Sequence, residues 1–462
     1  MTAILSGAQL TFVKQRTNGE RTASETKKKG RELNAGILEQ NAANTHAAAQ
    51  PKTPISSVIA ASSGNLVEWF DFYIYGFAAV YFAQNFSHAS NALFQQIEIF
   101  AVFAAGFLML PVGSLIFGRL ADKNGRKNAM IISIIAMGLG SILIAFLPDK
   151  HSIGDWAIAL LLLARLVQGV AVGGEFGIVA TYLTEIAPPN KRGFVSSFQY
   201  ATIIGAQLLA VASISLMSLF LDEAQMQSFG WRILFLLGGA LALISLIFRA
   251  FMKDDSPQML AKFANRGSLR ELARHIKPLL LVIGVTAGCT IGFYAITTYP
   301  KVFMINNGVD KIVANNIMLG SLFLLCLAIP LIGALSDKIG FKSSLFAYLS
   351  FCIVGIYPLF LLLKSTSSVA VMFAVCAFMC LMLGFYTAVA AISKTSLFPP
   401  HIRALGAGFG CMLSVGLFGG SVNYVALEFK AAGVEWGFFV YFAAVALISL
   451  VCVYLIPKER QL

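Results

Sequence analysis

Apolar runs of about 20 residues constrain the fold of this chain more than any other feature. A helix of that length crosses about 30 Å of hydrocarbon, and such runs follow one another from residue 60 to residue 456. The composition agrees, since 58% of the 462 residues are hydrophobic and 12% are charged. A soluble domain has about 25% charged residues. The sequence therefore predicts an all-α membrane protein.

The apolar runs divide into twelve expected spans. They are placed at 60–86, 97–117, 128–148, 157–185, 194–220, 231–252, 278–304, 313–335, 343–364, 369–397, 403–428 and 435–456. The polar, basic stretch 253–277 separates six from six and is expected to be a cytoplasmic linker between halves at 55–252 and 278–456. Residues 1–54 and 457–462 are expected to form cytoplasmic tails, the first of them disordered.

The Lys and Arg residues gather in alternate loops. Most of them lie between spans two and three, four and five, six and seven, and eight and nine, while the opposite loops hold few. Cytoplasmic loops carry an excess of Lys and Arg, so these loops and both termini are expected to be cytoplasmic. The net charge of +12 then reflects orientation, and we expect no nucleic-acid partner.

The cysteines and the absent motifs exclude several classes of protein. All seven cysteines fall in apolar runs of the second half and are interpreted as small buried packing residues. We expect no metal site and no structural disulfide. The sequence shows no nucleophile–base pair, phosphate loop or cofactor motif, so we expect neither an enzyme nor a bound cofactor.

Two carboxylates, Glu68 and Asp71, lie within the first span. Three residues apart, they share one helix face. A charge in hydrocarbon costs roughly 2.5–3.5 kcal/mol, so both are expected to face the interior or a wet cavity. All five histidines lie in the tail or near loops, which leaves carboxylates as candidate proton carriers. Alternatively, Glu68 lies near the cytoplasmic interface and pairs structurally with an Arg.

The fourth span contributes Arg165, Gln168 and Glu175. Arg165 and Glu175 are ten residues apart, which separates them by about 15 Å along the helix and roughly 80° around it. Each therefore needs a partner on another helix, and the first-span carboxylates are the expected partners of Arg165. Glu175 is a third candidate proton carrier, and Gln168 is expected to extend the polar patch around Arg165.

The second half offers different chemistry at its span interiors. Tyr294 and Tyr299 in the seventh span and Lys394 in the tenth suit the orientation of a small polar solute, and Tyr75 of the first span joins this set. Tyr299 is equally consistent with an aromatic belt at the membrane interface. These residues, with Arg165 and Gln168, form the expected substrate-binding set.

A charged turn occurs twice. The stretch GRLADKNGRK begins at Gly118, and GALSDKIGFK begins 215 residues later at Gly333, which predicts a duplicated bundle. The excess of positive charge in cytoplasmic loops explains the basic residues of this turn, and tight bends explain Gly118 and Gly125. Neither requirement explains the acidic residue Asp122. Asp122 is four residues before Arg126, which suits a local pair, and it is also placed to reach a helix N-terminus in the other half.

These residues resemble the major facilitator superfamily. The stretch beginning at Gly118 matches its motif between spans two and three, and SSGNLVEWFDFYIYG, RLVQGVAVGGEFG and the Asp255-Ser256-Pro257 sequence are similar to its metabolite:proton symporter family. The likeness runs from about residue 58 to residue 456. One position departs from the pattern, because Leu110 stands before Pro111 where members usually carry Arg. That departure weakens the expectation of a dianionic substrate.

The resemblance implies the major facilitator fold, with twelve transmembrane helices in two six-helix pseudo-symmetric halves that alternate access to a midplane site. It implies a monomeric symporter of the bacterial inner membrane that imports a small organic acid, α-ketoglutarate or a related dicarboxylate, with protons. A zwitterionic osmolyte or another metabolite is the alternative substrate, and a non-transporting solute sensor the alternative class.

The resemblance also suggests roles for two groups of residues. Arg165 is expected to hold a nearby carboxylate ionised in the empty site and to contact the substrate's charge in the loaded one. Asp122 and Arg126 are expected to latch the cytoplasmic side shut in the outward-open state. Asp337 would form a weaker mirror latch, because Phe341 replaces the arginine there.

Overall fold

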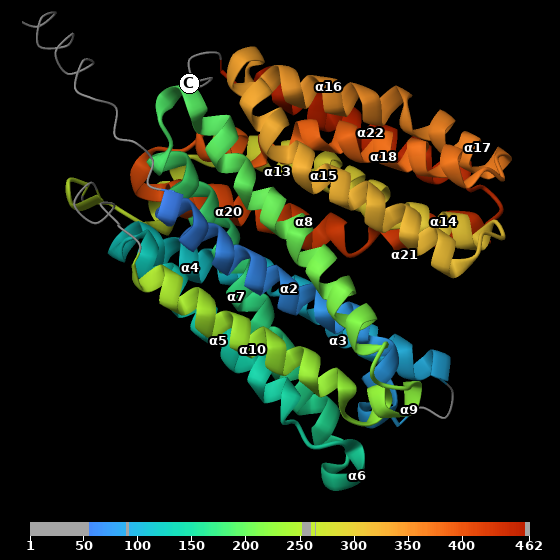
Figure 1. Cartoon of the computed structure of the whole chain (residues 1–462). Coiled ribbons are helices and arrows are strands. Elements are labelled where there is room, and N and C mark those ends of the chain that lie inside the picture. The colour runs from blue at the N-terminus through green and yellow to red at the C-terminus, as the bar shows by residue number, and fades with distance from the viewer. Residues whose placement is uncertain (1–54, 89–91, 252–259, 264, 458–462) are drawn as a thin grey trace, which may run out of the picture. The chain divides into compact units, whose positions relative to one another are not determined.

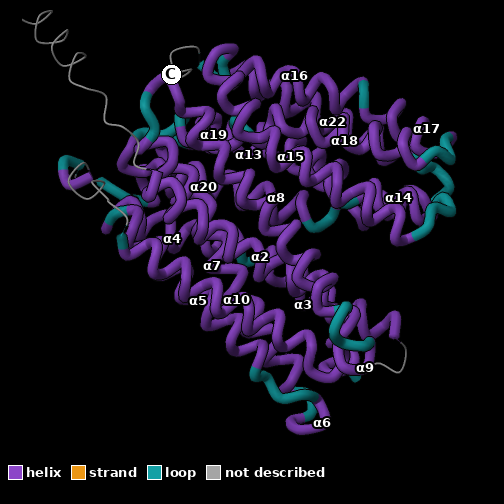
Figure 2. Tube along the Cα trace, viewed as in Figure 1, coloured by secondary structure: helices purple, strands orange, loops and turns teal. Residues whose placement is uncertain are grey.

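The computed structural model describes residues 55–88, 92–251, 260–263 and 265–457. The expected disordered tail at 1–54 lies outside them, as do residues 458–462. Every regular element of the described residues is a helix (Figure 2).

The first half contains seven long helices and several short ones. In chain order they are α2 (Ile55–Phe86), α3 (Ala92–Leu108), α4 (Leu110–Asn124), α5 (Arg126–Ala145), α6 (Lys150–Ile153), α7 (Trp156–Ile186), η1 (Pro189–Lys191), α8 (Arg192–Met217), α9 (Glu223–Gln225), η2 (Met226–Gly230) and α10 (Trp231–Ala250).

The stretch expected to link the halves holds one short helix, α12 (Leu269–Arg274). The second half follows with α13 (Ile276–Thr297), α14 (Tyr299–Asn306), α15 (Lys311–Ile339), α16 (Phe341–Val354), α17 (Ile356–Ser365), α18 (Val369–Thr387), α19 (Ala390–Thr395), η3 (Pro400–Ile402), α20 (Arg403–Ser414), η4 (Val415–Gly419), α21 (Val422–Ala431) and α22 (Trp436–Leu455).

The helices account for the twelve predicted spans. In the described residues ten helical segments are long and apolar enough to cross a membrane, and α16 with α17 forms an eleventh that is bent by 49°. The remaining span is α2, whose buried residues include Asn65, Glu68 and Asp71. The all-α fold with two six-helix halves is therefore confirmed.

Several spans are broken, and the sequence explains where. Pro111 follows the break between α3 and α4, and Pro300 follows the break between α13 and α14 at Thr298. Proline has no N–H to donate to the preceding turn. The charged turns are also built alike: Gly125 joins α4 to α5 with φ 99°, and Gly340 joins α15 to α16 with φ 85°. Only glycine adopts such positive φ values without strain.

Three pairs of helices form the main contacts between the halves. The helices α4 and α7 pack against α20, and α8 packs against α15 (Figure 1). The charged turns lie at the ends of α4 and α15. Each of these helices thus brings its turn to the N-terminal end of a helix from the other half, α20 or α8. We call this end of the bundle the charged-loop end.

All seven cysteines are free, and five of them are buried. They are Cys289, Cys326, Cys352, Cys376, Cys380, Cys411 and Cys452. Among the described residues, the search for three or more His, Cys, Asp or Glu side chains able to hold a metal ion found no group.

Candidate functional site

A cavity of about 520 Å³ lies between the halves. The first half lines it with aromatic residues of α2 and α3, and the second half with polar residues of α13 to α15. From α15 the lining residues are Asn315 to Leu322, which belong to its first turns. Because α15 ends at the turn that carries Asp337, the cavity lies toward the end opposite the charged loops.

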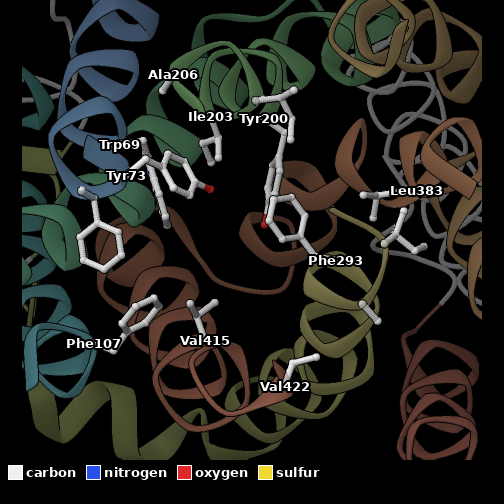
Figure 3. Close-up of a cluster of buried hydrophobic side chains, with 14 of the residues drawn as sticks. Trp69, Tyr73, Phe107, Tyr200, Ile203, Ala206, Phe293, Leu383, Val415 and Val422 are labelled. Atoms are coloured by element: carbon white, nitrogen blue, oxygen red, sulfur yellow. The ribbon is translucent and has the colours of Figure 1, made fainter. Parts of the chain in front are cut away.

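A narrow aromatic pocket of about 20 Å³ continues this cavity inward and shares Tyr73 and Tyr294 with it. Its wall also includes Trp69, Tyr200 and Phe293, and Figure 3 shows these side chains around a common opening. The Tyr73 hydroxyl and the indole N–H of Trp69 are buried and have no hydrogen-bond partner among the described residues. The pocket thus presents unused donors to a solute.

Behind this pocket lies Lys394, which is 1% exposed. Its Nζ donates to the Tyr386 hydroxyl at 3.2 Å, and that hydroxyl lies 3.1 Å from the hydroxyl of Tyr200. The ammonium also lies 4.9 Å from the ring centroid of Phe176. No described carboxylate lies within 4.0 Å of it. Among the described residues its charge is offset by aromatic faces, by phenols and by the nearby thiol of Cys411.

Arg165 is stacked among aromatic rings within the first half. Its guanidinium carbon lies 4.3 Å from the ring centroid of Tyr75, 4.9 Å from Phe72 and 5.1 Å from Phe103. Phe72 and Phe103 line the cavity, so they separate Arg165 from it. The Nε and Nη2 groups of Arg165 have no acceptor among the described residues.

The expected ion pair between Arg165 and a first-span carboxylate is absent. Instead Arg165 donates to Gln168 at 2.7 Å, Gln168 donates to the Ser141 hydroxyl at 2.9 Å, and Ser141 donates to Asp71 at 2.5 Å. Gln168 therefore does more than extend a polar patch. Two neutral side chains connect the charges, because the rings around Arg165 occupy the positions next to its guanidinium.

Glu175 has a partner that sequence reasoning missed, Arg249 of α10. Arg249 forms an ion pair with Glu175 and donates to the backbone oxygen of Met130, and Ser133 donates to Glu175 at 2.8 Å. Glu68 is 0% exposed, and neither of its oxygens accepts a hydrogen bond from a described residue. Glu68 therefore forms no direct ion pair with a described arginine in this structure, although Arg249 is among the charges that act on it.

Two glycines allow these charges to enter the contact between α2 and α10. A Cβ on Gly64 of α2 would overlap the Arg249 guanidinium, and a Cβ on Gly238 of α10 would overlap the Asp71 carboxylate. Each helix thus has a recess for the charged side chain of the other. Arg249 lies one residue before the end of α10, so the sequence is equally consistent with a basic residue that reaches water.

At the charged-loop end Asp122 forms the local pair with Arg126 that its spacing predicts. It also accepts hydrogen bonds from Ala404 N at 3.3 Å and Leu405 N at 2.9 Å, which belong to the first turn of α20. A Cβ on Gly118 would lie 2.8 Å from Leu405 Cα. The carboxylate therefore connects the arginine of one half to a helix N-terminus of the other.

The second charged turn repeats this geometry. Asp337 accepts hydrogen bonds from Gly193 N at 2.6 Å and Phe194 N at 3.0 Å, at the start of α8. No described Lys, Arg or His side chain lies within 4.0 Å of Asp337. The side chain at Arg126's equivalent position, Phe341, is buried.

Glu185 adds an element that sequence reasoning missed. It forms ion pairs with Arg126 at 3.2 Å and with Arg403 of α20 at 3.1 Å. Arg126 also donates to the Pro400 backbone oxygen at 3.1 Å. The first charged turn is thus held by a network across the two halves. A Glu nearly three turns beyond Glu175 on the same helix was the available signal.

Two of the expected substrate-binding tyrosines lie away from both cavities. Tyr75 donates to Ile99 O at 3.2 Å and lies against Arg165, while Tyr299 packs among aromatic rings including Phe303 and Phe360. Tyr75 shares the helix face of Asp71, which points into the first half. The cavity face of α2 instead carries Trp69 and Tyr73, four residues apart.

Lys301 was also missed, because it lies near the end of the seventh span and was counted among the few basic residues of the outer loops. The break at Thr298 begins a new helix, α14, and on it Lys301 lines the cavity and donates to Asn315 at 2.8 Å. It is the one charged side chain among the described residues that line the cavity. Pro300 was the signal for the change in helix direction.

Comparisons with known proteins agree with this architecture. Residues 57–266 match the model of the family described as "Sugar (and other) transporter". The proton:xylose symporter XylE bound to 6-bromo-6-deoxy-D-glucose is similar in fold, with a TM-score of 0.69 at 17% identity over 87% of this chain and 94% of that one.

The sequence relatives extend over most of the chain. It is 42% identical to the alpha-ketoglutarate permease of Escherichia coli over 88% of this chain and 94% of the permease. It is 30% identical to the citrate-proton symporter of Klebsiella pneumoniae over 86% and 91%, and 31% identical to the proline/betaine transporter of E. coli over 78% and 75%. The chain belongs to the major facilitator superfamily of membrane transporters, in the branch that holds the alpha-ketoglutarate permease.

Proposed function

We propose that this chain is a symporter that imports a small dicarboxylate, α-ketoglutarate or a close relative, together with protons across a bacterial inner membrane. The observation that carries the proposal is the charge of the cavity. Its one charged lining residue in the part of the chain that the structure describes is the cation Lys301, and Lys394 lies behind the inner pocket with no carboxylate of a described residue as its partner. A path with fixed positive charge and no acid in its lining favours anions.

The two lysines suit successive steps of binding. Lys301 lies in the wide cavity, where it attracts an incoming carboxylate. Lys394 adjoins the narrow pocket through Tyr386 and Tyr200, whose hydroxyls are 3.1 Å apart. A carboxylate in that pocket is a counter-ion for the buried ammonium, and the Tyr73 hydroxyl and Trp69 N–H supply further donors. These groups compensate for Leu110, which stands in place of the family's arginine.

Coupling to protons is assigned to Asp71 and Arg165. The chain through Ser141 and Gln168 ties the Asp71 carboxylate to the guanidinium. A substrate anion that draws on Arg165 weakens its hold on Asp71, and Asp71 then takes up a proton. For this step the rings of Phe72 and Phe103 must turn aside, because they separate Arg165 from the cavity in the present conformation.

The two latches suit a carrier that is closed at one end. Asp122 and Asp337 both bind helix N-termini of the opposite half, while the cavity lies toward the other end. With the basic loops and both termini in the cytoplasm, this is the outward-facing form of an alternating-access cycle. Gly118 and Gly125 allow the close approach and the turn on which the first latch depends.

A zwitterionic osmolyte is the second candidate substrate. The aromatic wall of the inner pocket favours it, because quaternary ammonium groups bind to aromatic faces, and a proline/betaine transporter is among the relatives. Lys394 opposes it, since a cationic ligand would be repelled there. A sensor that binds a solute without moving it has no specific observation in its favour.

Uptake into proteoliposomes tests the proposal. Labelled α-ketoglutarate is expected to accumulate when the outside is made acidic, and unlabelled dicarboxylates are expected to compete better than betaine or proline. Asp71→Asn is the test variant, since it is expected to bind substrate but to accumulate less of it under an acid gradient than the unaltered protein. Accumulation without a pH gradient, or inhibition by betaine alone, would overturn the proposal.

A further inference from the structure

A second group of buried charges lies apart from the Asp71–Arg165 chain. It comprises Glu68 of α2, Glu175 of α7 and Arg249 of α10, all 0% exposed. The charged groups that act on Glu68 are Glu175, Arg249 and Asp71, and the α5 helix adds the hydroxyl of Ser133, which donates to Glu175. None of the three lines the wide cavity or the narrow aromatic pocket described above.

The charges in this part of the bundle do not balance. Glu68, Asp71 and Glu175 contribute three carboxylates, whereas Arg165 and Arg249 contribute two guanidiniums. An uncompensated buried charge is costly because no water solvates it and no partner offsets it. At least one of the three carboxylates is therefore expected to hold a proton.

Hydrogen bonding identifies that carboxylate. Glu175 is paired with Arg249 and accepts from Ser133, and Asp71 accepts from Ser141 at 2.5 Å. Both oxygens of Glu68 lack a hydrogen-bond partner among the described residues, because the nearby Ser133 hydroxyl donates its one proton to Glu175 instead. An ionised carboxylate with no donor is the least favourable of the three, so the proton belongs on Glu68.

We propose that Glu68, with Glu175 and Arg249, is a second proton-binding site and that a dicarboxylate is carried with two protons per cycle, one on Asp71 and one on Glu68. This inference rests on the proposed function for its substrate. Glu68 and Asp71 lie one helical turn apart on the same face of α2, and Glu68 is the nearer of the two to the charged-loop end. The pair therefore leads from the cavity region toward the side on which protons are released.

Arg249 supplies the means of release. Its Nη1 group donates to Met130 O and its Nη2 group to Glu175, while its Nε has no acceptor in the described structure. The guanidinium thus keeps its Nε–H donor for a second carboxylate. When Glu68 engages that donor its anion is stabilised, and its proton leaves; when the contact is lost, Glu68 binds a proton again. No other bond forms or breaks.

The number of protons determines how transport responds to voltage. A dianion with two protons carries no net charge, whereas a dianion with one proton moves one negative charge inward. At an inside-negative potential of 100 mV that charge costs about 2.3 kcal/mol, which corresponds to roughly a fortyfold lower accumulation ratio. A pH gradient of one unit supports about hundredfold accumulation with two protons and about tenfold with one.

Steady-state uptake of α-ketoglutarate into proteoliposomes, with the potential set by potassium and valinomycin, tests the stoichiometry. The unaltered protein is expected to accumulate the same amount at 0 and −100 mV. Glu68→Gln, which mimics the protonated acid, is expected to still transport but to lose about fortyfold at −100 mV. Unchanged voltage independence in Glu68→Gln would overturn the proposal.

Infrared spectroscopy of the purified full chain gives a readout that needs no substrate. At neutral pH the unaltered protein is expected to show a carboxylic acid C=O band that is absent in Glu68→Gln and present in Asp71→Asn. Glu175→Gln is also expected to remove the band, because Arg249 is then free to pair with Glu68 and ionise it. A band that survives both Glu68→Gln and Glu175→Gln would overturn the second proton-binding site. If the expected bands are seen but no dicarboxylate is taken up, the proposed function is overturned and the second site stands.

Discussion

The carboxylate of Asp122 lies 2.9 Å from the backbone nitrogen of Leu405, although 283 residues separate them in the chain. Leu405 belongs to the first turn of α20, whose free N–H groups and helix dipole favour an anion. The contact therefore joins the two halves at the charged-loop end, and we propose that its strength sets how often that end opens.

Asp122→Asn is expected to loosen this end. A hydrogen bond to a charged group contributes about 1.5–3 kcal/mol, so loss of the charge should raise the open population by about 10- to 150-fold. Amide hydrogen exchange over residues 403–414, followed by mass spectrometry, measures the change. Asp337→Asn, which removes a carboxylate that has no arginine beside it, should raise exchange at residues 192–200 by less. Equal protection in all three proteins would contradict the latch.

Lys394→Met separates a substrate site from a structural one. Loss of the ammonium is expected to raise KM for the dicarboxylate by about 10- to 100-fold, in line with the 1.5–3 kcal/mol of a charged hydrogen bond. The melting temperature should not fall, since Lys394 has no carboxylate partner in the described structure. Arg249→Met is the contrast, because it leaves Glu175 unpaired and should cost about 3–5 kcal/mol of stability. A large loss of stability in Lys394→Met with normal KM would refute the assignment.

Two tyrosines of α2 test which face of the helix meets the substrate. Tyr73→Phe removes a buried hydroxyl that has no described partner, so KM is expected to rise several-fold with no loss of stability. Tyr75→Phe removes the hydrogen bond to Ile99 O, so stability should fall by about 1 kcal/mol while KM stays the same. Uptake kinetics and thermal unfolding of both variants measure this, and the opposite pattern would place the substrate on the Tyr75 face.

Gly64→Ala is expected to disrupt the first half, because its methyl group would overlap the Arg249 guanidinium. Displacement of Arg249 breaks a buried ion pair, at a cost of about 3–5 kcal/mol. Gly205 of α8 is a matched control, since a Cβ there would meet only Leu66 Cδ1 at 3.8 Å. Gly205→Ala should change stability by about 1 kcal/mol or less. Similar melting temperatures for the two variants would contradict the inference that Gly64 provides space for the Arg249 guanidinium.

Lys301→Gln tests the outer cation. Attraction of an anion into the cavity should weaken, raising KM and removing much of its dependence on ionic strength, because screening acts on that attraction. Lys364→Gln is the control, since Lys364 lies outside the cavity and pairs with Glu435 at 3.3 Å. Initial uptake rates at low and high salt measure the effect, and an equal change in both variants would exclude a specific role for Lys301.

The spans and the latch were predictable because local patterns determine them. Apolar length sets a span, and the four-residue spacing of Asp122 and Arg126 sets a pair on one helix surface. The partner of Asp122 on α20 could also be foreseen in kind, because the free N–H groups at a helix N-terminus attract an anion. The spans and the Asp122–Arg126 pair each depend on the sequence of one segment, and the second charged turn is a repeat of the first.

The partners of the buried charges were not predictable, because they depend on how helices are rotated against each other. Arg249 near the end of α10 is indistinguishable in sequence from a residue that reaches the interface. Tyr73 and Tyr75 are two residues apart, which places them about 200° apart around the helix. The expected substrate site included Tyr75, on the face of Asp71, whereas the cavity lies on the face of Tyr73. Lys301 depended on a change of direction at Thr298 that periodicity does not reveal.

The recesses at Gly64 and Gly238 also restrict how the molecule moves. A shift of α10 along α2 by one turn, about 5.4 Å, would drive both Arg249 and Asp71 into side chains that have no space for them. These two helices are therefore expected not to slide along each other, and we expect the first half to move as one rigid body. Helices that change shape during a transport cycle are then expected to do so elsewhere. The bend between α16 and α17 and the break at Thr298 are two places where a helix is already interrupted.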